Sequence, residues 1–300
     1  MRKGILCIVA SAFGFALMAF FVRLCDDFGG PVSCFQKSFF RNVIALAIAL
    51  AVFAKGGKSS RAQEPSSPSA IHNSSFIIHN SFLPLLLRAV FGTVGIFANF
   101  YALSRIPIGE AMTLNKTAPF FTVFFSWIFL GEKVSRRQAL CLVLAFFGAM
   151  LVMKPGFGGD DMFASAVALT GGLGAGLAYV CVHQLGRMKV AGAFIVLFFS
   201  AFSCIASLPF MVADFAPMTC GQVAILLGAG VGAAIGQFGV TAAYRYAEPR
   251  SIAAFDYTNV IFAAVLGCLF LGQSAPDAIT VLGFVVIVAM ARMVNGRKRS

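Results

Sequence analysis

A lysine within an apolar stretch is the residue of this sequence whose type and position most clearly suggest chemistry. Residues 111–130 carry a single charge, Lys116, and Pro119 follows three positions later. About 20 apolar residues at ~1.5 Å rise per residue cross a bilayer core of ~30 Å, so this stretch predicts a membrane span. A lysine inside a span costs about 2.5–3.5 kcal/mol on insertion scales and usually serves a function. We expect Lys116 to face a water-lined cavity and to attract an anionic substrate group; the alternative is a side chain that snorkels to the outer interface.

A second polar cluster occupies the matching place near the C-terminus. The residues FLGQ at 270–273 repeat FLGE at 129–132, which sets an offset of 141 between the two stretches. The same offset pairs Lys116 with Tyr257 and Asn115 with Asp256. Asp256 is the carboxylate that the sequence places within a span. It is a candidate for proton coupling, for neutralising Lys116 or Arg88, or for an ion pair that only orients helices.

Polar residues in other spans complete the candidate set. Arg88 lies near the cytoplasmic end of its span, where snorkelling competes with binding, and we expect Arg41 to be structural or to form an outer gate. Asn99 and Gln237 are candidates for lining a cavity, with interhelical hydrogen bonding as the alternative. We predict no catalytic residues and no metal ligands. The predicted substrate-binding residues are Lys116, Tyr257, Asp256, Asn115, Arg88, Asn99, Gln237 and Asn259.

The composition excludes a soluble protein. Hydrophobic residues make up 59% of the 300 residues and charged residues 11%, whereas soluble domains carry about 25% charged residues. The net charge of +12 does not indicate nucleic-acid binding, because the basic residues lie in short loops between apolar runs. The eight cysteines are scattered, without the spacing of a metal site or redox pair. We therefore expect no cofactor and no nucleic-acid partner; the expected partners are the lipid bilayer and a small-molecule substrate.

The apolar runs predict an all-α membrane protein of ten transmembrane helices. Open strands cannot satisfy their backbone groups in lipid, so the spans must be helical. With the N-terminus inside, 15 Lys and Arg residues lie at cytoplasmic ends, four at outer ends and four within spans, which accounts for all 23. This bias places both termini in the cytoplasm and the chain in the cell (inner) membrane. The predicted spans are 4–24, 34–54, 83–104, 110–130, 136–153, 163–186, 192–213, 222–244, 250–271 and 275–294.

The offsets divide the chain into two copies of one module. The first span of each half matches at an offset of 160 and the third at 140, which places about twenty extra residues in the first half. The Ser-, Pro- and Asn-rich segment 56–82 accounts for them, and we expect it to be a disordered cytoplasmic insertion. The predicted repeats are 1–154 and 160–295, followed by a basic tail at 296–300. Five spans per repeat is an odd number, so the second copy is inverted in the membrane, as in many secondary transporters.

The motifs resemble a known family. The stretch YALSRIPIGEA at 101–111, Pro119, LGE at 130–132, Arg41 and the segment from Arg88 to Gly92 are together similar to the EamA-type branch of the drug/metabolite transporter superfamily. The resemblance implies ten helices in two inverted five-helix repeats. It also implies a secondary carrier for amino acids, vitamins, nucleotide-like metabolites or drugs. The second half departs from the family pattern, with Gln273 where Glu is usual and Val260 where many members have Pro.

The sequence therefore predicts a secondary transporter that works by alternating access and is not an enzyme. The substrate is expected to be a small organic metabolite with an anionic group. A membrane-embedded enzyme would need clustered carboxylates, His pairs or an activated nucleophile, and a channel or a scaffold without carrier activity is the other alternative. Coupling to a proton at Asp256, the direction of transport, and the choice between monomer and homodimer stay open at this stage.

Overall fold

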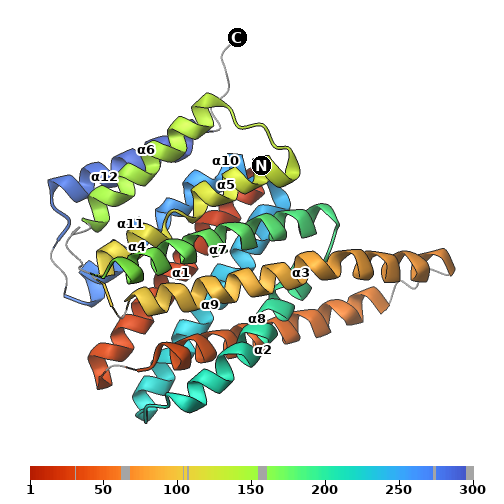
Figure 1. Cartoon of the computed structure of the whole chain (residues 1–300), viewed down its shortest axis with the longest axis horizontal. Helices are drawn as coiled ribbons and strands as arrows, with labels where there is room; N and C mark the ends of the chain where they lie inside the picture. The colour runs from red at the N-terminus through yellow and green to blue at the C-terminus, as the bar shows by residue number, and fades with distance from the viewer. Residues whose placement is uncertain are drawn as a thin grey trace.

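The structure is a computed structural model that describes residues 1–30, 32–61, 68–103, 105–106, 108–154, 161–272 and 275–294. Within these residues it contains helices and no strand, which confirms an all-α protein. In the first half the helices are α1 (Arg2–Gly29), α2 (Cys34–Arg61), α3 (Pro68–Leu103), α4 (Ile108–Asn115), α5 (Ala118–Leu130) and α6 (Arg136–Met153). In the second half they are α7 (Met162–Arg187), α8 (Gly192–Ala213), α9 (Cys220–Tyr246), α10 (Pro249–Ile252), the 3-10 helix η1 (Ala253–Tyr257), α11 (Thr258–Phe270) and α12 (Ala278–Met293) (Figure 1).

Eight helices of the described chain are long and apolar enough to cross a membrane, counting α10, η1 and α11 as one. The helix α12 is also apolar but has 16 residues. The span predicted at 110–130 is divided between α4 and α5, so neither part reaches that length alone. The chain is a multi-pass membrane protein, and the count of ten spans stays a prediction.

Two helices are interrupted at matching positions in the two halves. In the first half, α4 ends at Asn115 and α5 begins at Ala118. Pro119 explains the break, because it has no N–H to donate and its ring clashes with the carbonyl four residues earlier. In the second half, the chain tightens into η1 and the α-helix resumes at Thr258. At the offset of 141, Thr258 corresponds to Thr117, so the two breaks coincide, although the second has no proline at the corresponding place.

The helix pairs keep the same pattern when the two halves are exchanged. The helix α1 packs along α9 and α3 along α7, while α2 packs on α8 and α6 on α12 (Figure 1). Gly14 of α1 and its counterpart Gly174 of α7 permit the close approach in each pair: an added Cβ would lie 2.5 Å from the backbone nitrogen of Gly236 in one and 2.9 Å from the carbonyl oxygen of Phe91 in the other. Small residues at these crossings serve the same purpose in both halves.

Residues 56–61 and 68–82 are helical, where the sequence analysis expects disorder. The helix α2 continues to Arg61 and α3 begins at Pro68, so both helices extend beyond the predicted spans. Extending an existing helix by one residue needs only propagation and no new nucleus, so polar residues can continue it. Residues 62–67 and the predicted basic tail at 296–300 lie outside the described residues.

Candidate substrate cavity

A cavity of about 600 Å³ lies inside the bundle and is lined by residues of both halves. Its wall includes Arg23, Asp26 and Lys37, which lie where α1 ends and α2 begins. We call this side of the bundle the α1–α2 end. The wall also includes Arg88 and Gln237, which belong to the interior parts of α3 and α9. The cavity therefore extends from the α1–α2 end deep into the protein.

Seven of the eight predicted residues line this cavity: Lys116, Asp256, Asn115, Arg88, Asn99, Gln237 and Asn259. The eighth, Tyr257, is fully buried behind the wall. The structure thus brings seven of the predicted residues together around one cavity, and substrate binding by these side chains stays a prediction.

Lys116 and Asp256 face each other across the two halves. The Lys116 Nζ lies 3.4 Å from Asp256 Oδ2, and the two side chains are 15% and 12% exposed. The lysine thus points into the cavity and not to the outer interface. Among the described residues, the ion pair of Asp256 is made with Lys116 and not with Arg88.

Tyr257 holds the two breaks together. Because the backbone N–H of Phe120 bonds to the carbonyl of Thr117, the carbonyl of Lys116 lacks its usual helical donor. The hydroxyl of Tyr257 donates to that carbonyl oxygen at 3.2 Å. The counterpart of Lys116 in the second half therefore satisfies the backbone group that the break in the first half exposes.

Arg88 is fixed deep in the cavity wall, with 2% of its surface exposed. Its Nη2 donates to Gln237 Oε1 at 2.9 Å, and its guanidinium carbon lies 3.9 Å from the centre of the Phe199 ring. Gly92, one helical turn further on, leaves the space that the guanidinium occupies, since a Cβ there would overlap Arg88 Nη1. The cation is thus held by an amide oxygen and an aromatic face, and no carboxylate in the described part of the chain pairs with it.

The amide residues have different local roles. Asn259 donates to the carbonyl of Ala12 at 2.9 Å and so ties α11 to α1. The amide nitrogen of Asn115 lies close to Gly171 of α7, where an added Cβ would be 3.3 Å away. Asn99 lines the cavity nearer its α1–α2 end, together with Phe100 and Leu103 at the end of α3.

The structure places Arg41, which the sequence analysis expects to be structural or to form an outer gate, on the wall of the cavity. This side chain lines the cavity, is 6% exposed, and its Nε has no hydrogen-bond partner among the described residues. The signal was present, because a charged residue within a span usually faces the interior of the bundle. Tyr179 and Phe199 also line the cavity, and nothing in their sequence context distinguishes them from other aromatic residues.

The mouth of the cavity carries paired charges. Lys37 Nζ lies 2.7 Å from Asp26 Oδ2, and Arg23 Nε lies 3.2 Å from Asp27 Oδ2 in an exposed pair. These charges surround the entrance with balanced sign. Exposed pairs of this kind contribute little to stability, about 0–1 kcal/mol.

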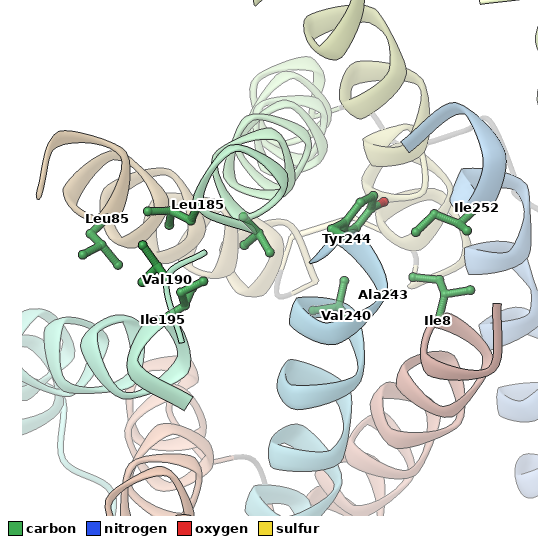
Figure 2. Close-up of a cluster of buried hydrophobic side chains, with 10 residues drawn as sticks. Ile8, Leu85, Leu185, Val190, Ile195, Val240, Ala243, Tyr244 and Ile252 are labelled. Carbon is green, nitrogen blue, oxygen red and sulfur yellow. The ribbon is translucent and has the colours of Figure 1, made fainter. Parts of the chain in front are cut away.

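The end of the bundle opposite the α1–α2 end is closed by packed side chains. Figure 2 shows a buried cluster there, to which the beginnings of α1 and α8 and the ends of α7 and α9 contribute. Tyr244 and Leu185 are among its large, fully buried members. The cluster comprises Ile8, Leu85, Val182, Leu185, Val190, Ile195, Val240, Ala243, Tyr244 and Ile252.

A polar contact closes the same end beside this cluster. His183 Nε2 lies 2.9 Å from Glu132 Oε1, and Ser126 donates to Glu132 Oε2 at 2.8 Å. His183 Nδ1 lies 2.6 Å from the carbonyl oxygen of Tyr244. Burial raises the pKa of Glu132, but the hydrogen bonds from His183 and Ser126 outweigh it, so the pKa lies below its usual value of 4.5. We call the Glu132–His183 contact the polar latch.

The sequence pattern of the EamA-like transporter family matches residues 2–154 of this chain, which is 153 of its 300 residues. The chain belongs to the EamA-like transporter family. The match ends where the sequence analysis ends the first repeat. Family membership confirms the resemblance seen in the motifs and indicates a transporter rather than an enzyme.

Relatives of this EamA-like transporter carry the names of transporters. The pseudopaline exporter of Pseudomonas aeruginosa is 29% identical over 301 residues, covering 100% of this chain and 98% of the relative. The riboflavin transporter of Rhizobium johnstonii is 28% identical and covers 68% of this chain and 67% of its own length. A solved crystal structure of another protein has a TM-score of 0.73 and 18% identity over 95% of this chain and 96% of that one. This last likeness shows the fold alone.

The chemistry available in the cavity of this EamA-like transporter is binding by charge and hydrogen bonds. Lys116, Arg41 and Arg88 offer donors, and Asp256 offers an acceptor. No group of three His, Cys, Asp or Glu residues within the described ranges is arranged to hold a metal ion. Amide side chains and the charges at the mouth add further polar groups, and most of the remaining wall is apolar, which is typical of sites that hold a small organic molecule through a few placed polar groups.

Proposed function

We propose that this protein is a secondary transporter that moves a small organic metabolite with an anionic group across the membrane by alternating access. Its relatives include an exporter of pseudopaline and transporters of riboflavin, so metabolites of that size are the expected substrates. A cavity of about 600 Å³ is large enough for a small metabolite. The Lys116–Asp256 pair between the two helix breaks, on the wall of this cavity, carries the proposal.

The exchange symmetry of the helix pairs supports two inverted repeats as the working parts. In inverted-repeat carriers, substrates bind near the midplane, at interrupted helices between the halves, and the halves rock around the site. Here the interrupted helices α4–α5 and α10–η1–α11 meet through Lys116, Asp256 and Tyr257. This position suits a substrate site that both sides of the membrane reach in turn.

The orientation follows from the distribution of basic residues. We place the protein in the inner membrane with both termini in the cytoplasm. In this orientation 15 basic residues lie at the cytoplasmic ends of the spans and four at the outer ends. The α1–α2 end then faces outward, and the conformation described above is open to the outside. The buried cluster and the polar latch close the cytoplasmic end, and both must separate for the inward-open state.

In this mechanism Lys116 pairs in turn with Asp256 and with the anionic group of the substrate. In the empty carrier it pairs with Asp256 at 3.4 Å. A substrate carboxylate or phosphate that approaches Nζ competes with Asp256, and Asp256 then becomes free to take a proton. The substrate and a coupling proton can thus bind in one exchange of partners.

Flux measurements in proteoliposomes test the proposal. A carrier gives saturable uptake and counterflow, in which substrate inside the vesicle accelerates entry of labelled substrate. A channel gives conductance that does not saturate, and an enzyme changes the compound chemically. Counterflow that is present in the native protein and absent in Lys116→Ala, with equal insertion of both, is the expected result. Absence of counterflow for every metabolite that binds the purified protein would contradict the proposal.

A further inference from the structure

The charges that line the cavity do not balance. Five cations line it, Arg23, Lys37, Arg41, Arg88 and Lys116, against two anions, Asp26 and Asp256. Lys37 pairs with Asp26, Lys116 with Asp256, and Arg23 with Asp27 at the mouth. Arg41 and Arg88 remain without a carboxylate partner among the described residues.

Both of these guanidinium groups are deeply buried. Arg41 is 6% and Arg88 is 2% exposed, and the Nε atoms of both have no hydrogen-bond partner among the described residues. Gln237 and the ring of Phe199 partly replace water around Arg88. A buried charge without a counter-charge is strongly unfavourable, so an empty cavity with two such cations is poised to bind anions.

A guanidinium group has a specific preference among anions. Its planar fork of donors matches the two oxygens of a carboxylate or of a phosphate, to which it binds in parallel hydrogen bonds. One monocarboxylate can neutralise one of the two arginines and leaves the other uncompensated. A ligand with two negative charges neutralises both within the same cavity.

We infer that the substrate of the proposed carrier is a dianion, and that Arg41 and Arg88 are the residues that select it. This inference rests on the proposed function and names the substrate class of its site. The two charges belong to one small molecule, either as two carboxylates or as one phosphate ester. Lys116 and Asp256 are not counted in this selection, because they already form a pair with each other.

A binding experiment on the purified full-length protein tests the inference. Thermal unfolding and calorimetric titration are followed at constant ionic strength with glutarate, glycerol 3-phosphate and butyrate as probes. We expect at least one of the two dianions to bind about 10-fold or more tightly than butyrate, since a hydrogen-bonded charge contributes about that much. Tighter binding of glutarate than of glycerol 3-phosphate identifies the substrate as a dicarboxylate, and tighter binding of glycerol 3-phosphate identifies it as a phosphate ester.

Three variants assign the preference to residues. Arg41→Gln and Arg88→Gln are each expected to reduce the preference for the dianion over butyrate by about 10-fold or more. The matched control is Arg23→Gln, because Arg23 also lines the cavity but is paired with Asp27 in an exposed position. This control is expected to keep the preference of the native protein.

A measurement without ligand guards against variants that only misfold. If Arg41 is an uncompensated cation, Arg41→Gln raises the unfolding temperature of the empty protein. The reason is that removing an unpaired buried charge from an empty binding site stabilises the folded protein. A fall of several degrees would mean that the fold compensates Arg41, and the inference would be overturned. Equal binding of dianions and butyrate by the native protein would overturn it as well.

Failure of this inference differs from failure of the proposed function. Saturable counterflow of a neutral or monoanionic metabolite, unchanged in Arg41→Gln, would leave the carrier standing and reject dianion selection. Binding of a dianion without counterflow would leave the site standing and reject the carrier.

Discussion

The two halves of this protein share one frame and carry different polar groups on it. Each half breaks one helix at the matching place, and each uses a glycine, Gly14 or Gly174, to bring a helix of the other half close. The residues at the breaks differ, because the second half has Asp256 and Tyr257 where the first has Asn115 and Lys116. The frame therefore depends on features that recur, whereas the chemistry depends on positions that diverged.

This divergence gives the cavity properties that two identical copies would not have. A cation in the break of one half attracts an anion in the break of the other, whereas like charges would repel. The two arginines that lack a carboxylate partner among the described residues are also unevenly divided, since Arg41 and Arg88 both belong to the first half. At an offset of 140, the position of Arg88 is taken in the second half by Gly228.

The largest effect is expected from removing the charge of the first break. Lys116→Ala deletes the cation that we propose meets the substrate, and losing one partner of a buried charge pair costs about 2–5 kcal/mol. We expect transport to fall more than about 100-fold while membrane insertion is retained, as measured by proteoliposome uptake and by thermal unfolding. Substrate affinity equal to that of the native protein would show that the lysine only anchors its helix.

The next variant makes the second break resemble the first. Asp256→Asn copies Asn115 and leaves Lys116 without its carboxylate, and breaking a buried pair costs about 3–5 kcal/mol at most. We expect the variant to have a lower unfolding temperature than the native protein. We also expect its uptake rate to depend less on pH than that of the native protein. Identical pH profiles would exclude Asp256 from proton coupling.

A pair of glycine variants separates site from frame. At Gly92 an added methyl group would overlap the guanidinium of Arg88, which is the end of a flexible side chain, and would lie 2.8 Å from the ring of Phe199. Gly92→Ala is therefore expected to weaken substrate affinity about 10-fold, with a smaller loss of stability than a clash with backbone atoms causes. Its counterpart in the second half is Gly232, where the methyl group would lie 2.7 Å from the backbone nitrogen of Met18. Gly232→Ala is expected to lower the unfolding temperature instead. Substrate titration and thermal unfolding of both variants measure this contrast, and similar effects in the two would contradict it.

The smallest effect is expected at the polar latch. The lowered pKa of Glu132 means that its ionised form stabilises the folded state above pH 4.5, and that this contribution is lost as the pH falls through the lower value in the folded protein. Glu132→Gln is therefore expected to lower the unfolding temperature by a few degrees at pH 7 and by less in acid. Thermal unfolding between pH 3 and pH 7 checks this, with Glu248→Gln, in the exposed pair with Arg250, as the control. An equal fall in the unfolding temperature of Glu132→Gln at pH 3 and at pH 7 would contradict a stabilising role of the ionised Glu132.

Much of the site was predictable because charges in apolar spans are few. The offset of 141 led from Lys116 to Asp256 and Tyr257, and the structure places all three at one junction. Membrane helices that are apolar on all faces give no periodicity from which to tell which side meets the cavity. The sequence therefore did not reveal that Phe199 holds Arg88, since this contact depends on how each helix is rotated about its axis. The sequence analysis also did not predict that α2 and α3 extend beyond the apolar spans. The reason is that amino-acid composition does not define the residue at which an existing helix ends.

The gap in the helical hydrogen bonds at Lys116 has a mechanical consequence. Tilting α5 against α4 at this point breaks no bond between the carbonyl of Lys116 and the N–H of Phe120, because that carbonyl accepts from Tyr257 instead. Bending an uninterrupted helix such as α9 would sacrifice such bonds. The interruption between α4 and α5 thus coincides with the lysine that we propose binds the substrate, so a bound anion would act on the chain at the point where the helix is interrupted.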